Sequence, residues 1–347
     1  MKFLSKILKV IGASLLTLLF GLTVFIYTIT PTLPDGTNKI IKEVIKNPLP
    51  ELITGQTGIA KSHGLNIWYE SILPKTPSKG AILLNMGIAN DGLAWPVQFI
   101  QALLDSGYQV IRYDYRGTGM SDWVDDWDKS HPYPLVDMAD DAIAILDTLH
   151  IEKAHVIGVS MGGMVAQEMA INHPERLLSL TSIMSSGFIT DPAMPKASND
   201  LVVKLVATAL RYGIIGGEKN MSKLFLSIRM ILVGDSKVDL NQKEMAEQVI
   251  YNIRHRKGFN KRVSQQHQAA VNLSGSRYHK LKQLQMPTLI IHGKQDPFIS
   301  IAHGRKCAEI IRYADTLWVD NMGHDLPNES LKPIIAKIVS NFDRRKP

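Results

Sequence analysis

One short segment of the sequence has the residue spacing of a nucleophilic serine. Gly158, Ser160 and Gly162 form a G-x-S-x-G pattern, which follows the apolar run Ala154–Ile157 and precedes a helical pattern that ends near His173. Strand, sharp turn and helix in this order make a nucleophile elbow, which projects the serine hydroxyl from the carboxyl edge of a sheet. Glycines two residues before and after the serine let strand and helix approach each other. A turn of this kind can serve packing alone, but the flanking patterns favour Ser160 as a catalytic nucleophile.

A serine nucleophile needs a general base, and the base needs a group that orients it. Among the eleven histidines, His324 lies in the loop directly after the last predicted strand. In a parallel sheet this loop reaches the same carboxyl edge as Ser160. The acid is expected between serine and histidine in chain order, and Asp296 follows a strand there. Asp315 and Asp320 are weaker candidates because they flank the last strand, and an acid after an earlier strand remains an alternative.

Two backbone N–H groups are expected to bind the oxyanion that forms when a serine attacks a carbonyl. The first belongs to Met161, at the start of the helix that follows Ser160. The second should come from the loop after the apolar strand Ala81–Asn85, where Gly87 permits a close backbone approach and Ile88 is the predicted donor. This chemistry needs no metal ion and no organic cofactor.

Other polar residues near the predicted site have structural interpretations. Asp114 and Arg116 precede the glycines Gly117 and Gly119. We expect them to be a charged pair that braces this tight turn rather than catalytic groups. The histidines of the long helical segment described below, His267 among them, are likewise expected to be structural.

The elements that must position these residues alternate between strands and helices. Continuous apolar strands between helical patterns predict a mostly parallel sheet with helices on both faces. Between Gly187 and about Leu284 the pattern is helical without clear strands, which predicts an inserted helical cap over the carboxyl edge. The predicted strands are a hairpin at 57–72, then Ala81–Asn85, Gln109–Tyr113, Ala154–Ile157, Leu178–Ile183, Thr288–His292 and Thr316–Val319.

The predicted cap is too long for an ordinary loop. Its run Leu224–Val233 is more apolar than one amphipathic face requires. One hypothesis is that Met230 and its apolar neighbours line a channel for an acyl or aromatic group, for which the flexible methionine is suited. The alternative is that this helix forms the core of the cap itself.

The N-terminus contains a candidate membrane span. Lys2, Lys6 and Lys9 precede Val10–Ile29, a run of about twenty uncharged residues that is long enough to cross a bilayer as a helix. The alternative is a cleavable signal peptide, which would have a shorter apolar region and a small-x-small site. We expect an uncleaved anchor with the lysines in the cytoplasm and the catalytic domain exported, although three further lysines after the span weaken this orientation.

The composition excludes several classes of protein. The net charge is +7 with basic residues spread thinly, which argues against a nucleic-acid surface and is compatible with an anionic membrane. The single cysteine, Cys307, excludes an intramolecular disulfide framework and a cysteine-based metal site. We expect this cysteine to be a small buried hydrophobe.

From about residue 55 to the end, the order of elbow, acid and histidine resembles the α/β-hydrolase superfamily. The runs VDMADDA, AHVIGVSMGGMVAQEMA and HPERLLSLTSIMSSG, together with Met86-Gly87-Ile88 and Trp95-Pro96, are similar to the aclacinomycin methylesterase-like or α/β-fold carboxylesterase branch. That branch usually has an acidic residue where Gly117 stands, and the N-terminal span is an addition. The resemblance implies an α/β-hydrolase fold and a serine esterase.

The function predicted from the sequence is that of a membrane-anchored serine hydrolase that cleaves carboxylic esters, with small apolar or lipid-like substrates. A proline aminopeptidase-type amidase or an acyltransferase on the same fold, and a non-catalytic binding protein, are the alternatives. The expected organisation is an anchor or signal sequence at 1–30, a linker at 31–53, the hydrolase core at 54–186 and 285–347, and the cap at 187–284. The expected partners are the ester and the membrane, and no nucleic acid.

Overall fold

A single eight-stranded sheet organises the part of the chain that the computed structural model describes, residues 2–344. The strands are β1 (Gln56–Ser62), β2 (Leu65–Ile72), β3 (Ala81–Asn85), β4 (Gln109–Tyr113), β5 (Ala154–Val159), β6 (Leu177–Ile183), β7 (Thr288–Gly293) and β8 (Asp315–Val319). Their spatial order is β1-β2-β4-β3-β5-β6-β7-β8. β2 pairs antiparallel with β1 and β4, and the other neighbours are parallel. The prediction of a mostly parallel sheet is confirmed.

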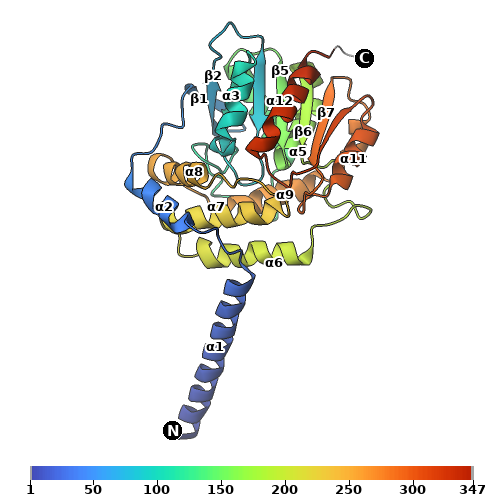
Figure 1. The fold of residues 1–347 in the computed structure, drawn as a ribbon. Helices are drawn as coiled ribbons and strands as arrows, with labels where there is room; N and C mark the ends of the chain where they lie inside the picture. Colours follow the sequence, from blue (N-terminus) through green and yellow to red (C-terminus); the bar gives the residue numbers. More distant parts are fainter. Residues whose placement is uncertain (1, 345–347) are drawn as a thin grey trace.

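Helices cover both faces of this sheet (Figure 1). Side chains of β3 alternate between the two faces, because successive residues of a strand point in opposite directions. Ile82 and Leu84 pack in one apolar cluster and Leu83 in the other. The first cluster includes residues of α3 (Val97–Asp105) and α12 (Asn328–Phe342), and the second includes residues of α4 (Leu135–Thr148), α5 (Met161–Asn172) and α11 (Ile301–Ile310).

The segment between β6 and β7 is helical and lies below one end of the sheet in Figure 1. It contacts two loops at the carboxyl ends of the parallel strands, through Leu232 to His324 and through His267 to Ala89. We call this segment the cap. Its elements are α6 (Asn199–Thr208), the π-helical turn η3 (Ala209–Gly213), α7 (Gly217–Val233), α8 (Gln242–His255), α9 (Val263–Ser274) and the short α10 (Tyr278–Leu281).

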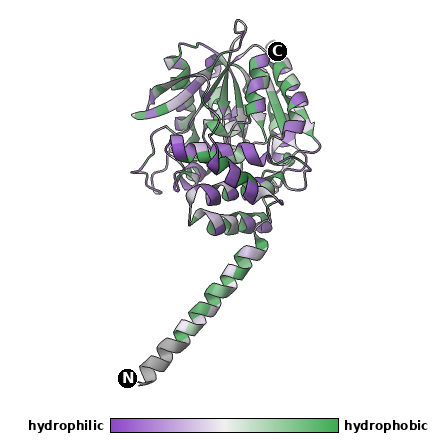
Figure 2. Cartoon of the chain, turned by 60° about the vertical axis from the view of Figure 1, so that its left-hand side comes forward, coloured by the Kyte–Doolittle hydropathy of each residue, from purple (hydrophilic) through white to green (hydrophobic). Residues whose placement is uncertain are grey.

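The N-terminal helix α1 (Lys2–Ile29) projects away from the domain (Figures 1 and 2). Its segment Ile11–Ile29 has a mean hydropathy of 1.9 and no residue buried against the rest of the chain. Length and composition therefore suit a membrane span, and a signal sequence near the N-terminus has the same two properties. The side chains of Lys2, Lys6 and Lys9 lie outside the described residues.

A second helix, α2 (Thr37–Lys46), connects α1 to the domain. Its buried residues Ile41 and Val44 pack against Leu226 of α7 and Ile250 of α8. The segment after α1 is therefore held against the cap by its own small apolar core.

Candidate active site

Ser160 occupies the sharp turn between β5 and α5. Its φ of 56° and ψ of −123° lie in a region that non-glycine residues rarely adopt, and such strain costs about 1–3 kcal/mol. A Cβ added to Gly158 would lie 2.1 Å from the carbonyl oxygen of Gly162, and one added to Gly162 would lie 2.1 Å from that of Asn85. Both glycines are thus required for strand and helix to meet around Ser160.

Ser160, His324 and Asp296 lie together in a hydrogen-bonded chain. The Ser160 Oγ is 3.0 Å from the His324 Nε2, and the His324 Nδ1 is 2.7 Å from an Asp296 carboxylate oxygen. The three residues come from the loops that follow β5, β8 and β7, all at the carboxyl ends of parallel strands. Because a carboxylate only accepts, Nδ1–H donates to Asp296 and Nε2 is left to accept from the serine hydroxyl.

The loop after β7 fixes the Asp296 carboxylate. One carboxylate oxygen accepts the backbone N–H groups of Phe298 and Ile299, at 2.9 and 2.8 Å. Burial raises the pKa of Asp296, but the neighbouring His324 and His292 outweigh it and hold this pKa well below its usual range. The side chain therefore stays ionised and able to orient the imidazole. The weaker acid candidates are engaged elsewhere, Asp315 with Lys337 and Asp320 with Lys294, at 2.7 and 2.5 Å.

The two predicted oxyanion donors belong to segments that lie next to the serine. Met161 is the first residue of α5, where a helix leaves its N–H groups without intrahelical acceptors. The loop after β3 passes close to the elbow, because a Cβ added to Gly87 would lie 3.6 Å from the Ser160 Cβ. Ile88 follows directly in that loop.

A histidine of the cap holds this second loop. His267 of α9 is fully buried, and its Nδ1 accepts the N–H of Ala89 at 3.1 Å while its Nε2 lies 3.0 Å from the Arg116 carbonyl oxygen. One neutral tautomer satisfies both contacts, and burial lowers the pKa of His267 to about 4. Ala89 has a φ of 59°, so the bond restrains a strained residue next to Ile88. Sequence reasoning gave His267 no such role, because 178 positions separate the two residues.

The cap also fixes the loop that carries His324. The backbone N–H of His324 donates to the carbonyl oxygen of Leu232, at the end of α7, at 2.8 Å. One turn earlier, Arg229 binds the carboxylate of Asp325 at 2.8 Å. The cap therefore touches the loops on both sides of Ser160, through α7 at the histidine and through α9 at Ala89.

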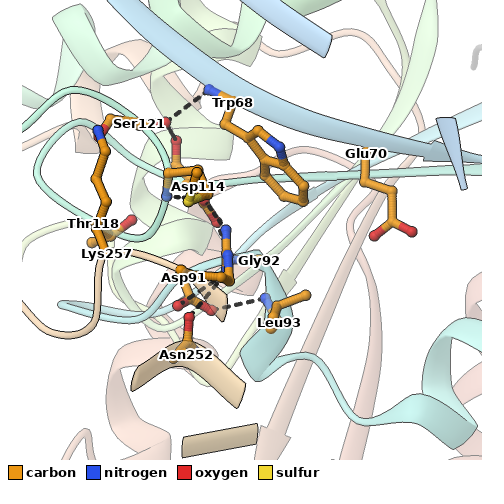
Figure 3. Close-up of polar contacts among 12 residues, drawn as sticks. Trp68, Glu70, Asp91, Gly92, Leu93, Asp114, Thr118, Ser121, Asn252 and Lys257 are labelled. Carbon is orange, nitrogen blue, oxygen red and sulfur yellow. Dashed lines mark hydrogen bonds and ion pairs between the residues drawn. The ribbon is translucent and has the colours of Figure 1, made fainter. Parts of the chain in front are cut away.

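Asp114 and Arg116 have structural partners, but they do not pair with each other as expected. The Asp114 carboxylate accepts the N–H group of Gly92 at 2.9 Å (Figure 3). It also accepts the N–H group of Met120 at 2.7 Å and forms an ion pair with Arg256 of the cap. Arg116 instead binds Asp141 of α4, at 2.7 and 2.8 Å. Buried charges need such close partners, so each residue uses the nearest opposite charge on a neighbouring element.

Comparisons with known proteins agree with this architecture. Rhodomycin D methylesterase DauP of Streptomyces sp. (strain C5) is 28% identical over 295 residues, which cover 80% of this chain and 95% of that protein. Poly(3-hydroxyalkanoate) depolymerase of Ectopseudomonas oleovorans is 29% identical over 280 residues, or 79% of this chain and 89% of that protein. The methylesterase match confirms the resemblance found in the sequence motifs.

Solved structures show the same fold. The esterase EaEST from Exiguobacterium antarcticum superposes with a TM-score of 0.63 at 18% identity and covers 84% of this chain and 100% of that chain. A family model described as "alpha/beta hydrolase fold" matches residues 80–328, which include Ser160, Asp296 and His324. The chain therefore belongs to the alpha/beta hydrolase fold family.

Proposed function

We propose that this protein hydrolyses carboxylic esters with Ser160 as nucleophile, His324 as general base and Asp296 as the group that orients the histidine. The hydrogen-bonded chain from Ser160 through His324 to Asp296 carries this proposal. It combines a strained, glycine-flanked serine with a base in hydrogen-bond reach and an ionised acid behind the base, which is the arrangement of a serine hydrolase.

In the proposed reaction, Ser160 Oγ attacks the ester carbonyl carbon while its proton passes to His324 Nε2. The N–H groups of Met161 and Ile88 bind the oxyanion, and Asp296 stabilises the imidazolium. Collapse of the tetrahedral intermediate breaks the C–O bond, and His324 returns the proton to the leaving alcohol. Water then attacks the acyl-enzyme with the same histidine as base, which releases the acid and restores Ser160.

The proposed substrates are esters with an apolar acyl or aromatic part. Two relatives are named for ester cleavage, a methylesterase and a polyester depolymerase, which supports ester over amide substrates. The apolar helix α7, which contacts the His324 loop, supports an apolar pocket. On the same fold, amide hydrolysis and acyl transfer are the competing activities.

A substrate screen tests this proposal. Purified enzyme would be assayed with p-nitrophenyl esters of graded chain length, aromatic methyl esters and amino-acyl amides, with Ser160→Ala as the matched control. We expect kcat/KM for an ester to exceed that for every amide and to vanish in the control. Faster cleavage of an amide, or ester turnover that survives in Ser160→Ala, would contradict the proposal.

We further propose that α1 anchors the enzyme in a membrane, with the catalytic domain on the exported side. The apolar stretch Ile11–Ile29 supports this location. Carbonate-washed membranes should retain the full-length protein, and the mature protein should keep its original N-terminus. A new N-terminus near Pro31 would instead identify a cleaved signal sequence.

A further inference from the structure

The outermost helix of the cap exposes apolar side chains where a water-facing helix would carry polar ones. Leu201, Thr208 and Tyr212 are buried against the rest of the chain. The opposite side is also apolar, although it faces outward. This exposed set, which we call the α6 face, runs from α6 through η3 to the following turn and is 41–80% exposed at its members Val202, Val203, Val206, Leu210, Ile214 and Ile215.

An apolar patch of this kind on a monomeric protein marks an interaction surface. In α6 the exposed apolar residues lie beside the charged Asp200 and Lys204, so the outward side is amphipathic. Within residues 2–344, α1 contacts α6 and η3, but the six members of the α6 face stay exposed. The α6 face is therefore available to a partner outside the described chain.

The candidate membrane span leaves the domain beside this face. Figure 1 shows α6 lying crosswise at the point where α1 meets the domain, and Figure 2 shows the same arrangement from another side. The contact is direct, since the Arg211 guanidinium lies 4.1 Å from the centre of the Tyr27 ring. If α1 crosses a bilayer, α6 lies parallel to the membrane surface, at the level of the lipid headgroups.

The charges around the face suit lipid headgroups. Between residues 196 and 223 there are five basic and two acidic side chains. Basic residues beside an apolar helix face are attracted to anionic lipid headgroups while the apolar side chains enter the acyl boundary. Tyr27 has the amphipathic ring that is enriched at this depth of a membrane. The basic residues are Lys196, Lys204, Arg211, Lys219 and Lys223.

We propose that the α6 face is embedded in the surface of the bilayer that α1 crosses, so that the cap rests on the membrane. This inference depends on the anchoring proposed above, and it concerns how the esterase meets its substrate. Helix α7 packs against α6 and bonds to the His324 loop, so α6 and α7 connect the lipid surface to that loop. Esters dissolved in the bilayer would then reach Ser160 by way of the cap.

Site-directed spin labelling of the full chain tests this proposal. The only native cysteine, Cys307, is buried, so a single introduced cysteine is selectively labelled. Three variants would be placed in vesicles of phosphatidylcholine and phosphatidylglycerol: Val206→Cys on the α6 face, Leu18→Cys on α1 and Leu73→Cys as control. Leu73 is a comparably exposed apolar residue that follows β2 beside the start of β4, at the end of the sheet opposite the cap.

We expect the labels at positions 206 and 18 to collide with lipid-dissolved oxygen, and the label at 73 to collide with a water-soluble nickel chelate. A lipid-exposed label at 18 with a water-exposed label at 206 would overturn the docking while leaving the anchor intact. Water exposure at both would overturn anchor and docking together. A label at 206 that is shielded from both reagents and shows dipolar coupling to a second label would mean that another copy of the chain covers the face, which also overturns the proposal.

A kinetic comparison separates this proposal from the esterase activity itself. The double variant Val206→Asp with Ile215→Asp puts charge on the α6 face, away from Ser160. It should lower kcat/KM several-fold for an ester incorporated in vesicles and leave a short water-soluble ester unaffected. If the double variant and the wild type hydrolyse the vesicle ester at equal rates, the docking is contradicted. If the wild type hydrolyses neither ester, the proposed function is contradicted.

Discussion

His267 of the cap binds the backbone N–H of Ala89, the residue that follows the proposed oxyanion donor Ile88. The imidazole joins three separate parts of the chain, because its other nitrogen contacts the carbonyl of Arg116. The cap is therefore attached to the loop that carries the proposed oxyanion donor.

We expect His267 to act as a positioning residue. In His267→Ala the Ala89 N–H loses its acceptor and the strained loop can relax, which should lower kcat by up to about 10², the cost of one oxyanion donor, with KM little changed. His267→Asn, which can still place an acceptor near that N–H, should recover part of the loss. Steady-state kinetics of both variants provide the check. Equal losses in the two variants, or a change in melting temperature without a change in kcat, would assign His267 a purely structural role.

The same histidine should make stability fall in acid. Burial lowers the pKa of His267 from 6.5 to about 4 in the folded chain, so the unfolded chain takes up the proton first as pH falls. The free energy of unfolding should therefore decrease by about 3 kcal/mol on this account between pH 6.5 and pH 4. Urea unfolding over this range should show a shallower pH dependence for His267→Asn than for the wild type. Identical slopes would mean that the imidazole takes up its proton at the same pH in the folded and unfolded chain, which would contradict the lowered pKa.

The choice of acid is tested by two matched substitutions. Asp296→Asn keeps the shape of the side chain but no longer fixes the imidazole tautomer, so kcat should fall by about 10⁴. Asp320→Asn, in the neighbouring loop, removes only the ion pair with Lys294 and should leave kcat near the wild-type value. The reverse pattern would show that the acid has been wrongly assigned.

The acyl pocket is tested on α7. Met230 is half-buried on this helix, next to Arg229, which binds the loop of His324. Met230→Ala or Met230→Trp should shift the preferred chain length of the ester, because alanine enlarges and tryptophan narrows an apolar pocket lined by this residue. Met221→Ala, at the other end of the same helix, serves as the control. Unchanged relative kcat/KM across the ester series in both Met230 variants would show that α7 forms the core of the cap rather than the pocket.

Elements with strong local signals were predictable from the sequence. β3 and β4 have the predicted bounds Ala81–Asn85 and Gln109–Tyr113, because short apolar runs between turn residues define a buried strand. The turn at Ser160 was predictable from an equally local signal, because two glycines within five residues mark the close approach of strand and helix.

Contacts between distant segments were not predictable. Asp114 pairs with Arg256, 142 positions away, rather than with the nearby Arg116, and no local pattern signals this. The exposed apolar side of α6 was likewise hidden, because periodicity alone does not tell an outward face from a buried one. How the cap sits on the core decides both features, and that arrangement depends on packing between residues far apart in the chain.

Active-site labelling of the full-length protein tests the central claim, that Ser160 is the nucleophile. A fluorophosphonate reacts covalently with an activated serine, and mass spectrometry of the digested protein locates the adduct. We predict a single adduct on the Ser160 peptide, none in Ser160→Ala, and strongly slowed labelling in His324→Ala, because the base that activates the hydroxyl is missing. An adduct on another residue, or no reaction of the folded wild-type protein, would contradict the account.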